Sequence, residues 1–185
     1  MSLLVIFACT PAARAEVRLP HIFGSRMVFQ RNMPIKVWGW ARPGEKVWVT
    51  LAKTELLTMA AENGNWQVTF DPMPAGGPYT MTIVDRNIIH FQDILVGDVW
   101  ICSGQSNMQM RLCFRDTVVE NGREAAASAD YPRIRFFRAQ KLYSPFAYTD
   151  CGGFWHRCTP DTAGSFSACA YFFGRKIHQE TQVPI

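Results

Sequence analysis

Gly97-Asp98-Val99-Trp100-Ile101-Cys102-Ser103-Gly104-Gln105-Ser106-Asn107-Met108 is the stretch of this chain that decides its fold. The run Val99–Cys102 is continuously apolar, which is typical of a fully buried strand, and Gly104 allows a sharp turn after it. A serine that follows such a strand lies at its carboxyl end, where open α/β sheets place their reactive groups. The pattern therefore favours Ser106 as a nucleophile. A helix from Asn107 would turn its free N–H groups toward a forming oxyanion.

A plainer interpretation of the same turn stays open. Serine and asparagine are favoured helix caps, so Gly104–Asn107 is equally typical of an ordinary strand-to-helix connection with a capping serine. Cys102 is the weaker candidate nucleophile because it lies inside the predicted strand. Ser106 itself requires a neighbouring general base, since an unassisted serine hydroxyl is a weak nucleophile.

Composition excludes several classes of protein. The 185 residues are 48% hydrophobic and 18% charged, which suits a folded globule and not a disordered tail. The net charge is only +4, and the basic residues are scattered, so nothing in the sequence indicates nucleic-acid binding. No apolar stretch approaches the roughly 18–20 residues of a membrane-spanning helix, so no membrane partner is expected.

The first 15 residues have the pattern of an export signal. An apolar segment spans Leu3–Cys9, and Ala13-Arg14-Ala15 is a small-x-small cleavage site that would leave Glu16 as the first mature residue. The alternative is a buried first strand, because no positive charge precedes the apolar segment. We expect export to the periplasm or the cell exterior.

Residues 16–93 have the pattern of an antiparallel β-sandwich. Alternation of apolar and polar residues, with turns rich in glycine, proline and asparagine, predicts strands at Ile35–Trp40, Lys46–Leu51, Trp66–Phe70, Tyr79–Val84 and Ile88–Phe91. Exposed aromatic side chains in such a domain would suit sugar binding. In so short a domain, however, core positions are expected for Trp38, Trp40, Trp48 and Trp66.

Residues 94–185 have the pattern of an α/β domain. A buried strand is predicted at Val96–Cys102 and a second at Arg133–Arg138, with helices from Asn107, at Val118–Ala129 and at Ser167–Thr181. Ser165 or Ser167 would cap the last helix. Spacing of three and four residues predicts that its buried face consists of Phe166, Ala170, Phe173, Gly174 and Ile177.

The cysteines leave more than one interpretation open. Five of the six would remain after cleavage of the signal, an odd number that leaves at least one unpaired thiol. Cys151 and Cys158 flank two glycines and suit a loop disulfide in an oxidising compartment. With His156 they also make three potential metal ligands, but the spacing matches no zinc pattern, so no metal is expected. Cys102 and Cys169 are expected to be buried as small apolar residues.

The central stretch resembles the sialate O-acetylesterase family, carbohydrate esterases related to the SGNH hydrolases. The hallmark is a Gly-Asp-Val-Trp strand followed by Cys-Ser-Gly-Gln-Ser-Asn-Met. Further segments that look like the family are Tyr131–Phe137, Thr149–Trp155, Cys158–Thr162 and Phe166–Arg175. The chain departs from the family at Arg111, where proline is common, and at Cys169, where valine is usual.

The resemblance implies a serine esterase that removes O-acetyl groups from sialic acid or other acylated sugars, without a cofactor. Ser106 would attack the acetyl carbonyl, its own N–H would help hold the oxyanion, and Gly104, Gln105 and Asn107 would shape the turn. Family members are several hundred residues long and carry the triad's acid and base in a late Asp-x-x-His segment.

None of the four histidines of this chain lies in an Asp-x-x-His segment. We therefore expect residues 94–185 to be the first part of an SGNH-type domain, weak or inactive alone. The rival hypothesis is a non-catalytic carbohydrate-binding or interaction fragment. The sequence does not reveal the oligomeric state.

Overall fold

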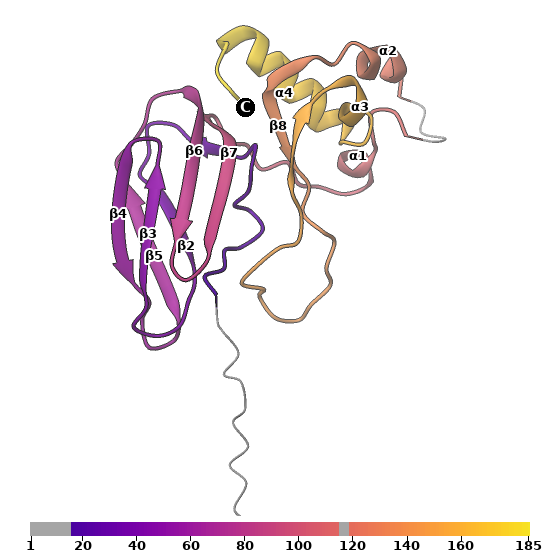
Figure 1. Cartoon of the computed structure of the whole chain (residues 1–185). Coiled ribbons are helices and arrows are strands. Elements are labelled where there is room, and N and C mark those ends of the chain that lie inside the picture. The colour runs from indigo at the N-terminus through magenta and orange to yellow at the C-terminus, as the bar shows by residue number, and fades with distance from the viewer. Residues whose placement is uncertain (1–15, 115–118) are drawn as a thin grey trace, which may run out of the picture.

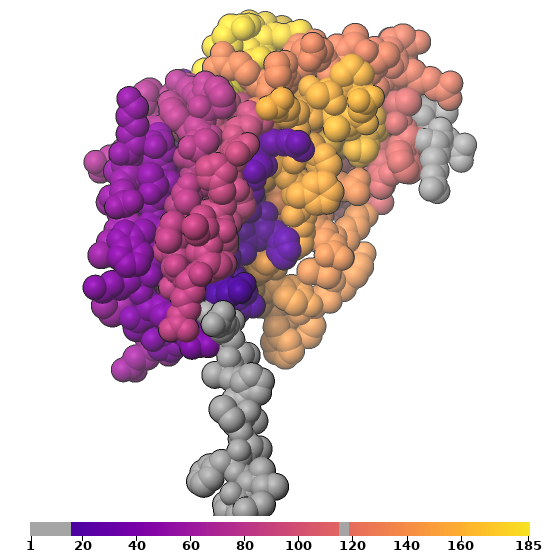
Figure 2. All heavy atoms as spheres, in the orientation of Figure 1, coloured from indigo at the N-terminus to yellow at the C-terminus, as the bar shows by residue number. Residues whose placement is uncertain are grey.

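The computed structural model describes residues 16–114 and 119–185, in two parts that lie side by side (Figures 1 and 2). The first part is built of strands and ends at Gly97. The second contains four helices and two strands within the described residues. The expected export signal, residues 1–15, and the start of the helix predicted from Val118 lie outside the described residues.

The first part consists of two sheets. The larger has the strand order β1-β7-β6-β3-β4 and the smaller pairs β2 with β5. The strands are β1 Val28–Gln30, β2 Ile35–Trp40, β3 Lys46–Leu51, β4 Thr54–Met59, β5 Asn65–Phe70, β6 Gly76–Val84 and β7 Ile88–Gly97. The larger sheet is mixed, not purely antiparallel as predicted, because β1 lies parallel to the end of β7, with Val28 opposite Leu95.

The core of this part lies between the two sheets. Along β3 every second residue is buried, and the same is true of β5, so each strand turns one face to the core. β3 contributes Val47, Val49 and Leu51, and β5 contributes Trp66, Val68 and Phe70. Burial of each large side chain stabilises the fold by about 1.5–3 kcal/mol.

The prediction that four tryptophans of this part lie in the core is confirmed for Trp66, which is buried, and Trp40 is half-buried. It is wrong for Trp38 and Trp48, whose exposed fractions are 40% and 37%. Trp48 shares its face of β3 with Lys46 and Thr50, two residues from it on either side, so it points away from the core. Alternation along the strand therefore outweighs the general tendency of aromatic residues to be buried.

The second part packs its strands and helices around a smaller core. Its elements are α1 Ser106–Gln109, α2 Gly122–Ala127, β8 Tyr131–Phe137, β9 Trp155–Cys158, α3 Pro160–Ala163 and α4 Ala168–Thr181. β8 and β9 pair as an antiparallel hairpin. The side chain of Tyr171 on α4 is fully buried there, and its hydroxyl donates to the Ala125 carbonyl oxygen at 3.0 Å.

The last helix forms where it was predicted, with Ser167 as its cap. The Ala170 N–H donates to Ser167 Oγ at 3.3 Å. The predicted buried face is wrong in part, because Phe173 is exposed and its ring packs edge-on against Trp100 at 5.1 Å. The residues buried along α4 are Ala168, Tyr171, Gly174 and His178, which still repeat at three to four residues.

The end of the described chain pairs in the manner of a parallel strand. The Ile185 N–H donates to the Arg133 carbonyl at 3.1 Å, and its carbonyl accepts from the Arg135 N–H at 2.7 Å. On the other side the Asp98 N–H donates to the Pro184 carbonyl at 2.9 Å. Pro184–Ile185 thus lies between β8 and the segment that follows Gly97. A Cβ on Gly97 would stand only 2.0 Å from the Pro184 oxygen, so this approach requires glycine.

Ion pairs and hydrogen bonds join the two parts. Asp93 of β7 accepts from Arg135 Nη2 at 2.9 Å and from Arg157 Nε at 2.7 Å. Trp155 Nε1 donates to the Ile22 carbonyl at 2.7 Å. Since β7 continues to Gly97, a boundary drawn at residue 93 falls inside this strand.

Limited proteolysis is expected to cut the second part first. The segment Tyr143–Gly153 contains neither helix nor strand, and Tyr143 and Phe146 are among the most exposed side chains. Mass spectrometry of the early fragments should locate the first cut there and find residues 16–97 intact. Early digestion within β2–β6 would contradict this order. We expect a second early cut within Asp116–Asp130. This segment includes α2 and lies partly outside the described residues.

Candidate active site

The segment after β7 is anchored at its start to the first part of the chain. Asp98 forms a two-pronged ion pair with Arg31, with Nε to Oδ1 at 2.8 Å and Nη2 to Oδ2 at 3.0 Å. The Val99 N–H donates to Gln30 Oε1 at 2.9 Å. These bonds fix the direction in which the chain leaves the β-sheet toward Ser106.

The prediction of a buried strand at Val96–Cys102 is wrong beyond Gly97. The exposed fractions are 41% for Val99, 53% for Trp100 and 94% for Ile101, and residues 98–105 are assigned to no strand. A strand needs a neighbour that takes up its N–H and C=O groups. Among the described residues only Pro184 offers this, at Asp98. The apolar run therefore lies extended at the surface.

Ser106 is the first residue of α1, a single helical turn, so this helix begins one residue before the predicted start. The Met110 N–H donates to the Ser106 carbonyl at 3.0 Å, and the preceding Gln105 makes no side-chain cap. Gly104, Gln105, Ser106 and Asn107 are all exposed. The serine therefore presents its hydroxyl to solvent, where a substrate can reach it.

Gly104 serves the turn through its small size. A Cβ at this position would lie 3.1 Å from the Met108 Cβ, a tight contact, and no positive φ is recorded there. Behind the turn, Ser167 Oγ donates to Met108 Sδ at 3.3 Å, and Cys169 Sγ contacts the Asn107 carbonyl at 3.6 Å. The start of α4 therefore packs against α1.

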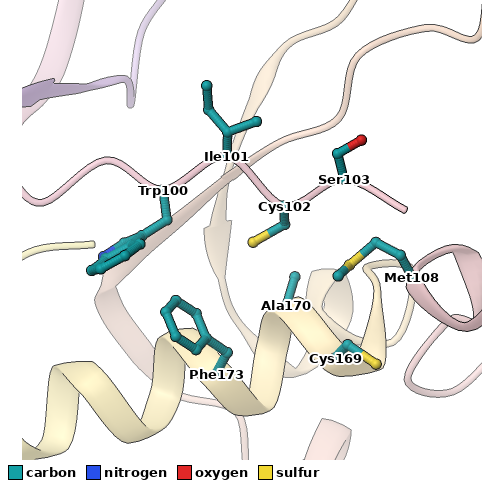
Figure 3. Close-up of a pocket in the computed structure, with 8 residues that line it drawn as sticks. All are labelled: Trp100, Ile101, Cys102, Ser103, Met108, Cys169, Ala170 and Phe173. Carbon is teal, nitrogen blue, oxygen red and sulfur yellow. The ribbon is translucent and has the colours of Figure 1, made fainter. Parts of the chain in front are cut away.

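A pocket of about 290 Å³ lies between this segment and α4. Figure 3 shows Cys102, Met108 and Phe173 directed into the space between segment and helix, while Ile101 points away. Its lining is completed by Trp100, Ile101, Ser103, Cys169 and Ala170. The pocket is largely apolar and lies within a few residues of Ser106 along the chain.

The expected burial of Cys102 and Cys169 is wrong, since both side chains are exposed. Partial burial still raises the pKa of the Cys102 thiol, which lowers its thiolate fraction at neutral pH. Cys151 and Cys158 are free thiols and form no disulfide. Cys158 lies in the core, where burial raises its pKa to about 12.

The recorded contacts of the four histidines are with residues other than Ser106. Three form hydrogen bonds through Nδ1: His21 with Asp150 at 2.6 Å, His90 with Thr82 at 2.9 Å, and His178 with the Val183 carbonyl at 2.7 Å. The fourth, His156, packs against Phe154 and Phe166, and its pKa is lowered by burial and by the positive charges of Arg26 and Arg138. In the described part of the chain, none of these histidines has a recorded hydrogen bond to Ser106.

The described residues contain no cluster of three or more histidine, cysteine or acidic side chains able to hold a metal ion. Across the same residues, none of the helices has the length and apolar character needed to cross a membrane.

No protein-family model matches the chain. Curated relatives do match it. The rat (Rattus norvegicus) sialate O-acetylesterase is 29% identical over 205 residues, covering 100% of this chain and 37% of the relative. The mouse (Mus musculus) enzyme is 30% identical and covers 99% and 37%, and the human enzyme is 30% identical and covers 91% and 35%.

A solved structure also matches this chain. A carbohydrate acetylesterase from Xanthomonas citri superposes with a TM-score of 0.87 at 33% identity, covering 92% of this chain and 39% of that enzyme. The chain thus spans little more than a third of the length of the proteins that it matches. Over nearly all of its own length, this chain is a homologue of part of the sialate O-acetylesterases, with the fold of a carbohydrate acetylesterase.

Proposed function

We propose that this chain carries the nucleophile of a serine carbohydrate esterase that removes O-acetyl groups from sialic acid or other acylated sugars. The observation that carries the proposal is the exposed Ser106 hydroxyl, on a surface turn close to an apolar pocket, in a chain similar to acetylesterases. In this proposal the residues that follow β7, 98–185, are the first part of an SGNH-type domain.

The proposed reaction has two steps. Ser106 Oγ attacks the acetyl carbonyl carbon while a histidine base takes its proton, and the Ser106 N–H donates to the oxyanion. The bond from the carbonyl carbon to the sugar oxygen then breaks, and the sugar leaves with the proton. Water next hydrolyses the acetyl-serine to acetate and restores Ser106. Gly104, Gln105 and Asn107 hold the turn in place.

The base for this reaction is proposed to come from residues other than the four histidines of the chain. His21 and His178 hydrogen-bond through Nδ1 to Asp150 and to a backbone carbonyl, and neither has a recorded hydrogen bond to Ser106 among the described residues. His156 lies between aromatic rings, and its pKa is held below the ordinary value. Its lowered pKa alone does not make it a base for Ser106, since proton transfer requires hydrogen-bond contact.

We expect the isolated 185-residue chain to hydrolyse 4-nitrophenyl acetate at a rate close to that of buffer. Without an adjacent base the Ser106 hydroxyl stays protonated, so Ser106→Ala should change the rate little. Stopped assays with the wild-type chain and this variant, at equal concentration, make the comparison. Turnover at the level of the Xanthomonas citri enzyme, abolished by Ser106→Ala, would overturn the expectation.

A chimera tests the proposed function itself. This chain would replace the matching 39% of the Xanthomonas citri acetylesterase, whose remaining length supplies the rest of the enzyme. We expect the chimera to release acetate from O-acetylated sialic acid or from acetylated neutral sugars, with the parent enzyme as the positive control. A folded chimera that releases no acetate from either substrate would favour the non-catalytic hypothesis.

Export is a separate part of the proposal and rests on residues 1–15 alone. Cleavage after Ala15 would give a mature chain that starts at Glu16. The intact mass of the protein recovered from the medium or periplasm of an expressing bacterium tests this. An uncleaved chain retained in the cytoplasm would contradict it.

A further inference from the structure

The outer face of the five-stranded sheet carries two unlike rows of side chains. Opposite residues on neighbouring strands follow from the register of β3 with β4, β3 with β6, and β6 with β7. The apolar row crosses four strands and consists of Leu57, Trp48, Val84 and Ile88. The polar row runs beside it, two residues further along each strand, and consists of Glu55, Thr50, Thr82 and His90. We call these eight residues the outer-face platform.

The apolar row is open to solvent. Trp48 is 37% exposed, and Leu57 and Ile88 at the two ends of the row are 54% and 72% exposed. Figures 1 and 2 place the second part of the chain beside this sheet and not over β3 and β4. A continuous exposed apolar row of this kind marks a binding surface more often than isolated exposed residues do.

The polar row supplies hydrogen-bonding groups along the same line. Thr50 Oγ1 donates to Glu55 Oε2 at 3.3 Å, and Thr82 Oγ1 bonds to His90 Nδ1 at 2.9 Å. These pairs hold the side chains in place and leave the second carboxylate oxygen of Glu55 and Nε2 of His90 for other partners. Donors and acceptors thus border the indole of Trp48.

From this pairing we propose that the outer-face platform binds a neutral oligosaccharide chain, independently of Ser106. A pyranose ring has an apolar face of C–H bonds and an edge of hydroxyl groups. The first packs on an indole, and the second bonds to carboxylate, hydroxyl and imidazole groups. Glu55 is the one acidic residue of the eight, and Lys46 lies beside Trp48 on the same face of β3, so the charges on this face balance and a neutral sugar is favoured.

A second copy of the chain suits this surface less well. Docking two such faces would bury the Glu55 carboxylate and the His90 imidazole, which costs free energy unless each finds a partner in the new interface. A sugar ring can pack its apolar face on the apolar row and bond through its hydroxyl groups to the polar row at the same time. The four strands, spaced about 4.8 Å apart, give the row a length of roughly 14 Å, enough for a short oligosaccharide.

The test is titration of the full chain with cellohexaose, xylohexaose and mannohexaose, followed by calorimetry and tryptophan fluorescence. We expect at least one of the three to bind, and Trp48→Ala to weaken that binding about tenfold or more. Trp38→Ala is the matched control, because Trp38 is equally exposed but lies on β2 of the opposite sheet, so binding should be unchanged.

A second variant tests the same surface if Trp48→Ala fails to fold. Ile88→Ser changes the most exposed end of the apolar row and is expected to weaken the same binding while the thermal unfolding curve stays the same. The proposal is overturned if none of the three sugars binds, or if Trp38→Ala weakens binding as much as Trp48→Ala. It is also overturned if sedimentation shows self-association that Trp48→Ala abolishes.

Discussion

Ser106→Ala is expected to lower the kcat of the acetylesterase chimera by several orders of magnitude, with little change in its folding. The substitution removes the atom that forms the acetyl intermediate, and a catalytic serine acts as a unit with its base and orienting carboxylate. Loss of the nucleophile therefore removes the contribution of the whole group. Ser106 is exposed and its hydroxyl supports no hydrogen bond recorded among the described residues, so its loss costs the fold little.

Two control variants separate this role from a structural one. Ser103→Ala removes the neighbouring hydroxyl that lines the pocket, and it should leave kcat within a few-fold of the parent chimera. Ser167→Ala removes the cap of α4 and should lower stability by about 1 kcal/mol with a smaller effect on kcat. If Ser106→Ala retained most of the activity, or if Ser103→Ala lost as much, Ser106 would not be the nucleophile. Initial rates of acetate release and thermal unfolding curves give both readouts.

The sequence predicted the elements whose signal is local. β2 and β3 begin and end at the predicted residues, and the cap at Ser167 starts α4 where it was expected. β4 was missed because the turn at Ala52 contains no glycine or asparagine, although Ala52 adopts a φ of +54°. β1 and β9 were missed because they are short and are held by distant partners, β7 and β8.

Burial could not be predicted where it depends on parts of the fold that are far apart. The apolar run Val99–Cys102 has the composition of a core strand, but whether it is covered depends on which strands lie beside it. Phe173 is spaced as a core residue of α4 and instead packs on Trp100 of that exposed segment. The local pattern predicted a helix starting next to Ser106, but it did not predict that the segment before Ser106 lies exposed and outside any strand.

Asp93→Asn is expected to destabilise the chain by about 3 kcal/mol, because it leaves a buried cation without its counter-ion. The Arg135 side chain is only 2% exposed, and Asp93 is its sole ion-pair partner among the described residues. Burial lowers the pKa of Arg135 most, Arg157 and Arg26 add to the lowering, the Asp93 carboxylate opposes it, and the resulting pKa is about 10. Asparagine keeps the size of the side chain and tolerates the φ of +59° at this position, so the substitution removes the charge and one of the two acceptor oxygens without straining the backbone.

Arg157→Gln is the matched control for Asp93→Asn, because Arg157 bonds to the same carboxylate but is 48% exposed. An exposed ion pair contributes at most about 1 kcal/mol, so this variant should unfold close to the wild type. Pairing Asp93→Asn with Arg135→Met removes both buried charges and should recover most of the lost stability. Urea unfolding of the wild type and these three variants gives the free energies of unfolding to be compared. Equal losses for Asp93→Asn and Arg157→Gln, or no recovery in the double variant, would mean that the buried charge at Arg135 does not determine how firmly the two parts are joined.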